Sequence, residues 1–120
     1  MGLWVKERKN GGIVVLEMSG RLTIGDPILQ LRETVHRYVA EGVIAFVLDL
    51  TDLLYIDSAG LGELVSTCAT VRKRHGDVKL LNLSNRVKDL MQLTNLLTIF
   101  DTYTDETIAT SGFRSGIGRA

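Results

Sequence analysis

The feature that most constrains the fold is an uninterrupted apolar run, Val43-Ile44-Ala45-Phe46-Val47-Leu48, rich in strand-forming side chains. Such a run is typical of a strand that is covered on both faces, as in a parallel sheet. A helical pattern follows it, with an apolar face made of Leu61, Leu64, Val65, Cys68 and Val71. A strand followed by a crossover helix predicts an α/β protein.

The segments around this unit extend the alternation. A hairpin is predicted at the N-terminus because Asn10-Gly11-Gly12 separates two strand-like runs, and Ser19-Gly20-Arg21 ends the second run. Asp26 is predicted to cap the next helix, Pro27 suits its first position, and Gly42 closes it. In all, strands are expected over 3–8, 13–18, 43–50, 78–83 and 97–100, and a loop is expected over 51–55.

A third helix is predicted after Ser84, and a short fourth helix over Thr104 to Thr110. The resulting order predicts one domain over residues 1–110, with a mixed sheet of about five strands and about four helices. Residues 111–120 are expected to form a flexible tail.

Composition narrows the function classes. Fourteen basic and fourteen acidic residues cancel, and no basic stripe with interleaved aromatics occurs, which disfavours nucleic acid as a partner. The single cysteine, Cys68, excludes an internal disulfide and favours a reducing compartment. No apolar run reaches membrane-spanning length and no signal-peptide pattern opens the chain, so a cytoplasmic location without a membrane partner is expected. An unpaired outer strand allows a monomer or a weak homodimer.

The most informative motif is Ile56-Asp57-Ser58-Ala59-Gly60-Leu61-Gly62, which joins the apolar strand to the next helix. Asp57 can cap that helix alone, which leaves Ser58 free to point outward at the positive helix end. Gly60 and Gly62 each cost about 1 kcal/mol relative to alanine in a helix, so they indicate close approach of another backbone. A plain helix cap remains the alternative for Ser58, and tight helix-on-sheet packing the alternative for Gly62.

Enzymatic and ligand-binding interpretations fit the residues poorly. Ser58 lacks the first glycine of a nucleophile elbow, and His75 should lie roughly 25 Å away along the same helix. His36 falls in the middle of another helix, and both histidines are expected to face solvent.

Neither nucleotide fingerprint is complete, so no cofactor is expected. Asp49, Asp52 and Asp57 could surround a hard cation, but caps and turns explain them better. Cys68 is interpreted as core, and Trp4 as a packing residue.

The segment Leu48 to Gly62 resembles the signature of STAS domains, in the anti-anti-sigma factor branch. Gly20-Arg21-Leu22, Leu80 to Ser84 and Leu90 to Leu96 resemble other parts of that family, so the resemblance covers roughly Leu3 to Ala109. Where the family usually has Thr-Gly-Leu, this chain has Thr94-Asn95-Leu96, and asparagine tolerates the same left-handed backbone. The resemblance implies a mixed sheet with helices on one main face.

The resemblance also implies a non-enzymatic regulator. In such proteins the serine that matches Ser58 is phosphorylated by an anti-sigma factor that is a serine kinase, and a PP2C-type phosphatase reverses this step. The unphosphorylated form binds the anti-sigma factor and frees a sigma factor in transcriptional stress responses. A stressosome-type scaffold subunit and a soluble subunit of a lipid or anion transport system remain alternatives.

We expect the partner surface to centre on Ser58 at the carboxyl ends of the strands, because loops converge there. It would include the 51–55 loop, the exposed side of the second helix and the 20–26 loop. Charge reversal at Asp26 or Glu63 is expected to weaken binding with little change in stability. The predicted partner-binding residues are Asp26, Thr51, Asp52, Tyr55, Asp57, Ser58, Ala59, Gly60, Gly62 and Glu63.

Overall fold

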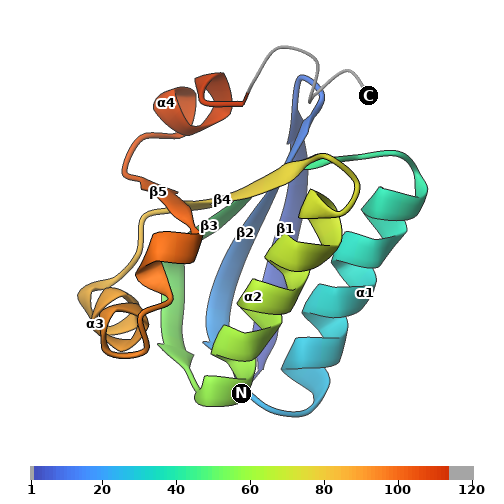
Figure 1. The fold of residues 1–120 in the computed structure, drawn as a ribbon. Coiled ribbons are helices and arrows are strands. Elements are labelled where there is room, and N and C mark those ends of the chain that lie inside the picture. Colours follow the sequence, from blue (N-terminus) through green and yellow to red (C-terminus); the bar gives the residue numbers. More distant parts are fainter. Residues whose placement is uncertain (1, 114–120) are drawn as a thin grey trace.

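The computed structural model describes residues 2–113 and contains the predicted order of elements. Figure 1 shows the strands and helices, with a short 3-10 turn, η1, before the last strand. The elements are β1 (Leu3–Asn10), β2 (Ile13–Leu22), α1 (Asp26–Ala40), β3 (Ala45–Ile56), α2 (Ser58–Arg72), β4 (Asp77–Leu81), α3 (Asn85–Leu93), η1 (Leu97–Ile99), β5 (Asp101–Tyr103) and α4 (Glu106–Ser111).

The strands form one mixed sheet in the order β1-β2-β3-β4-β5. β1 and β2 pair antiparallel as the predicted hairpin, and the other neighbouring strands pair parallel. The expected fold class, a single α/β domain with a five-stranded mixed sheet and four helices, is therefore confirmed for the described residues.

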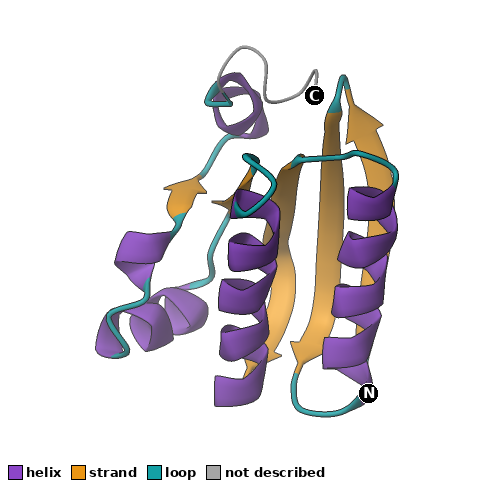
Figure 2. Cartoon of the chain, turned by 45° about the vertical axis from the view of Figure 1, so that its right-hand side comes forward, coloured by secondary structure: helices purple, strands orange, loops and turns teal. Residues whose placement is uncertain are grey.

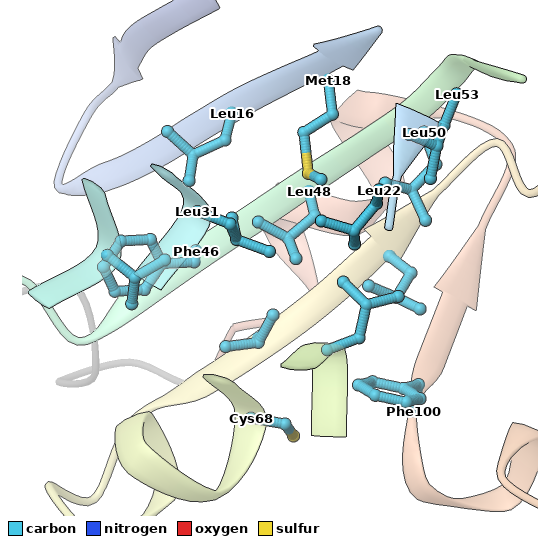
Figure 3. Close-up of a cluster of buried hydrophobic side chains, with 14 of the residues drawn as sticks. Leu16, Met18, Leu22, Leu31, Phe46, Leu48, Leu50, Leu53, Cys68 and Phe100 are labelled. Atoms are coloured by element: carbon cyan, nitrogen blue, oxygen red, sulfur yellow. The ribbon is translucent and has the colours of Figure 1, made fainter. Parts of the chain in front are cut away.

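The two faces of the sheet carry different layers. α1 and α2 lie side by side on one face, as Figure 2 shows, and α3 contributes to the same core. Figure 3 shows part of this core, where apolar side chains from β2, β3, α1 and α2 meet. Cys68 is buried among them, as predicted. On the opposite face α4 covers a smaller cluster, Val15, Val47, Leu81 and Ala109.

Strand β3 extends further than the sequence indicates. The predicted loop over 51–55 is wrong, because β3 continues to Ile56 beside a β2 strand that runs through Gly20 to Leu22. Two register shifts against β2 place extra residues in β3, and Gly20 supplies a φ of 95° between them. Such bulges hide the strand pattern, because they interrupt the alternation of side chains.

Two other local predictions also need correction. The segment predicted as a strand over 97–100 is mainly the η1 turn, which packs Leu97, Ile99 and Phe100 on the core, and β5 follows it. Asp26 does not cap α1, because Gly25 with a φ of 104° occupies the N-cap position. Asp26 is instead the first helical residue, where a negative charge still favours the helix dipole.

The helix caps predicted for α2 and α3 are confirmed. Asp57 accepts a hydrogen bond from the Gly60 N–H, and Ser84 accepts one from the Val87 N–H. Asn95 adopts the left-handed backbone expected of it, with a φ of 62°. Of the predicted tail, Ser111 ends α4, and residues 114–120 lie outside the described residues.

Candidate functional site

Asp57 organises the junction between β3 and α2. Its carboxylate accepts hydrogen bonds from the Ile24 N–H at 3.0 Å and from the Gly60 N–H at 2.7 Å. These donors, with Ile24 first, hold the pKa of Asp57 below its usual value because they stabilise the carboxylate form. Asp57 therefore fastens the β2–α1 loop to the first turn of α2 and fixes the surroundings of Ser58.

Ser58 is the first residue of α2 and is exposed. Within residues 2–113 its hydroxyl makes no hydrogen bond, because Asp57 already satisfies the Gly60 N–H. The alternative in which Ser58 serves as a plain cap is thereby excluded. An exposed, unbonded hydroxyl at a helix N-terminus is accessible to a phosphoryl-transferring enzyme, and the helix end favours the charge that results.

The two glycines of the motif have opposite surroundings. Gly60 is buried, and a methyl group there would lie 2.1 Å from the Leu22 carbonyl oxygen. Gly62 is exposed, with no atom of the described residues within 4 Å of such a methyl group. Gly60 therefore serves close approach of the Leu22 backbone of the same chain, and its role as a partner-contact residue stays a prediction. Gly62 leaves open space beside Ser58, so internal packing does not explain it.

Glu63 is not on the exposed side of α2. It is only 5% exposed and accepts a hydrogen bond from Arg32 of α1 at 2.7 Å. Thr67, one turn later, is buried as well, because α2 is covered by both the sheet and α1. The expectation that charge reversal at Glu63 leaves stability nearly unchanged does not fit this burial, because the reversal would break the pairing of α2 with α1. Its contact role stays a prediction.

Exposed apolar side chains near Ser58 were missed by sequence reasoning. Ile24, whose N–H binds Asp57, is 76% exposed, and Leu29 in the first turns of α1 is also exposed. A solvent-exposed isoleucine at this position is informative because its backbone N–H binds Asp57, the residue before the free serine. Ile24 lies in the segment predicted as the 20–26 loop, but the sequence of a loop does not show which of its side chains are exposed.

The structure separates part of the predicted surface from Ser58. Thr51 lies in β3, roughly 16 Å along the strand before Ile56. Thr51 and Asp52, both exposed, help to line a shallow concavity of about 610 Å³ together with Trp4. Trp4 is 62% exposed, and its ring lies against Gly20 on the edge strand β1, which agrees with its interpretation as a packing residue. Asp26 is exposed at the start of α1, and Ala59 is half-buried beside Ser58.

Two cationic side chains lie over the ring of Tyr55. The Arg21 Cζ is 4.4 Å from the centroid of the Tyr55 ring, and the Arg86 Cζ is 5.5 Å from it. Arg21 comes from β2, where it pairs with Tyr55 in register, and Arg86 comes from the first turn of α3. This cluster at the carboxyl end of the sheet was not predicted.

The described residues contain no group of three or more potential metal ligands. Asp49 instead accepts hydrogen bonds from the Thr51 N–H and hydroxyl, consistent with a turn-like role. His36 and His75 are exposed, as predicted. Among residues 2–113 no helix is both long and apolar enough to cross a bilayer.

Comparison with known proteins agrees with the fold. Residues 5–109 match the family model described as STAS domain, so the chain belongs to the STAS family, as the resemblance predicted. The anti-sigma-B factor antagonist of Bacillus subtilis is 32% identical over 102 residues, which cover 84% of this chain and 91% of that protein. The anti-sigma F factor antagonist of Paenibacillus polymyxa is 25% identical over 109 residues, covering 88% of this chain and 91% of that protein.

Solved structures show the same fold at lower identity. A candidate anti-sigma factor antagonist from Thermotoga maritima superposes with a TM-score of 0.85 at 23% identity, over 92% of this chain and 95% of that chain. Phosphorylated SpoIIAA from Bacillus superposes with a TM-score of 0.71 at 19% identity, over 90% of this chain and 98% of that chain.

Proposed function

We propose that this protein is a non-enzymatic anti-sigma factor antagonist that is controlled by phosphorylation of Ser58. The observation that carries the proposal is the exposed and unbonded Ser58 hydroxyl at the start of α2. The similarity to antagonists of anti-sigma factors supports the partner class. In the unphosphorylated form, the chain would bind a kinase-type anti-sigma factor and thereby release a sigma factor.

The contact surface is proposed to include the exposed Ile24, Leu29 and Gly62 around Ser58. Exposed aliphatic side chains supply apolar area, and the bare Gly62 allows a partner backbone to approach α2 closely. Asp26 adds a negative charge at the margin of this surface. Thr51 and Asp52 belong to a separate region of β3 and make a smaller contribution.

The switch follows from the chemistry of the modified serine. The kinase would transfer the γ-phosphoryl group of ATP to the Ser58 oxygen, with loss of the hydroxyl proton and release of ADP. The product carries about 1.5 to 2 negative charges, beside the carboxylate of Asp57. A docked partner would have to desolvate that charge, so binding should fail while the fold is retained. A PP2C-type phosphatase would restore the free hydroxyl.

The test is a titration of the anti-sigma factor candidate against four forms: wild type, Ser58→Ala, Ser58→Asp and the phosphorylated protein. We expect Ser58→Ala to bind like wild type and the phosphorylated form to bind at least about 100-fold more weakly. Ser58→Asp should fall between them because it adds one charge. Thr107→Asp, at an exposed position in the first turn of α4 on the opposite face of the sheet, is the matched control. Equal affinity for all forms would refute the switch and favour a passive scaffold role.

A further inference from the structure

Of the stack formed by Arg21, Tyr55 and Arg86, only Tyr55 belongs to the predicted partner surface. Both guanidinium groups lie over one ring, at 4.4 and 5.5 Å from its centroid, so their Cζ atoms are at most about 10 Å apart. The attraction between each cation and the ring favours a position of both side chains at the carboxyl end of the sheet, although Arg86 is exposed.

Neither guanidinium has a carboxylate partner among the described residues. Four other arginines of that range do, since Arg8, Arg32, Arg37 and Arg72 each donate to a glutamate or an aspartate. Two positive charges within about 10 Å repel each other, and an anion placed near both would offset this repulsion by attracting each of them. The stack is therefore suited to receive an anionic group with several acceptor oxygens.

Ser58 lies within a short reach of this stack along the chain. Tyr55 precedes Ser58 by three residues, so their Cα atoms are at most about 11 Å apart even in a fully extended chain. The segment that carries Arg21 also touches the α2 junction, because Leu22 accepts a hydrogen bond from the Asp57 N–H and Ile24 donates one to its carboxylate.

We propose that Arg21 and Arg86, positioned by the Tyr55 ring, receive the phosphate group of phosphorylated Ser58. Rotation of their flexible side chains would supply charge-assisted hydrogen bonds to its oxygens, which are stronger than neutral ones. This proposal rests on the proposed function, since it requires a phosphate at Ser58. It explains how a group with up to two negative charges is accommodated next to Asp57 without disturbing the fold.

The measurable consequence concerns the second ionisation of the phosphate, whose pKa is ordinarily about 6. Nearby guanidinium charges favour the dianion and lower this pKa, whereas the carboxylate of Asp57 raises it. We expect the two arginines to prevail, because each can bond directly to the phosphate oxygens. The pKa should then lie roughly half a unit below 6 at low ionic strength and return toward 6 in salt.

The experiment uses the full chain with phosphoserine incorporated genetically at position 58, so that no kinase is needed. Phosphorus NMR titration is compared between this protein and its Arg21→Gln and Arg86→Gln variants. Each substitution should raise the phosphate pKa. The matched control is Arg74→Gln, because Arg74 is exposed and has no carboxylate partner in the described range. It lies beyond the C-terminal end of α2, which is about 21 Å from Ser58 along the helix axis. This control should leave the pKa unchanged.

A second pair of variants tests the role of the ring. Tyr55→Phe keeps an aromatic face and should preserve the lowered pKa, whereas Tyr55→Leu should raise it in part. Identical titration curves for the parent, Arg21→Gln, Arg86→Gln and Arg74→Gln would overturn the proposal. That result would leave the proposed function intact, because the affinity of the phosphorylated form for its partner is measured separately.

Discussion

At the amino end of the parallel strands, Arg8 of β1 donates to Glu17 and also to Glu106 of α4, and the buried Lys79 donates to Asp101. At the carboxyl end, Arg21 and Arg86 have no carboxylate partner in the described range, and Ile24 and Leu54 are 76% and 74% exposed. The charged side chains named at the amino end are paired with one another, whereas those at the carboxyl end are unpaired among the described residues and lie near exposed apolar side chains.

This difference assigns separate tasks to the two ends of one sheet. Ion pairs between β1 and α4, and between β4 and β5, fasten the short C-terminal elements to the sheet. Around Ser58, Arg32 pairs with the buried Glu63 between α1 and α2. The hydrogen bonds of Asp57 organise the backbone there and leave the Ser58 hydroxyl unbonded among the described residues. A surface that is ordered locally but not satisfied internally is suited to a partner.

The largest effect on stability is expected at Gly60, which is buried at the carboxyl end of the sheet. In Gly60→Ala, the new methyl group would meet the Leu22 carbonyl oxygen at 2.1 Å, so β2 and α2 would have to separate. We expect the free energy of unfolding to fall by about 3 kcal/mol, at the upper end of overpacking effects. Urea denaturation followed by circular dichroism measures this loss.

Gly62→Ala is the matched control for that substitution. Its methyl group would enter open space, and alanine favours a helix by up to about 1 kcal/mol relative to glycine. The stability should therefore rise slightly or stay the same. If both variants lost the same stability, the contrast between a packed and an open glycine would be wrong. Gly62→Gln should also fold normally and should weaken partner binding by filling the space beside Ser58.

These glycines show where sequence reasoning reached its limit. The motif predicted the strand-to-helix junction, the Asp57 cap and the free serine, because each depends on local spacing. Which glycine faces Leu22 depends on the rotation of α2 against the sheet, and that rotation is set by tertiary packing. Glu63 was misplaced for the same reason, since its burial requires α1 and Arg32 at its side.

The stack on Tyr55 was beyond sequence reasoning for a different reason. Arg21 and Arg86 are 65 residues apart and come from a strand and a helix that are adjacent only in the folded chain. The extended β3 was hidden by its two register shifts, which interrupt the alternation that predicts a strand. Local sequence rules thus predicted the helices and strands, whereas the stacked arginines and the β-bulges at the carboxyl end of the sheet could be seen only in the structure.

A smaller effect separates the arginines of the two ends. Arg8→Gln should lower the free energy of unfolding by about 1 kcal/mol, because it breaks a half-buried pairing with Glu17 and Glu106. Arg21→Gln, the matched variant at the other end, should cost less than about 0.5 kcal/mol. Equal losses in thermal and chemical denaturation would contradict the contrast between the ends.

The Arg8 effect should also depend on pH with a defined sign. The Arg8 hydrogen bond holds the pKa of Glu106 below its usual value in the folded protein. A lowered pKa means that this stabilisation is present above the ordinary glutamate pKa, about 4.3, and is lost as the pH falls through the folded-state pKa. The stability difference between wild type and Arg8→Gln should therefore shrink below about pH 4.

The smallest stability effect is expected at Ser58 itself. Ser58→Ala removes a hydroxyl that has no hydrogen-bond partner in the described residues, so unfolding should change by less than about 0.5 kcal/mol. Ser84→Ala is the matched control, because Ser84 caps α3 through the Val87 N–H and its loss should cost about 1 kcal/mol. A destabilisation of Ser58→Ala as large as that of Ser84→Ala would show that Ser58 supports the fold. A stability close to wild type would instead show that the fold does not need the Ser58 hydroxyl, as the proposed regulatory role expects.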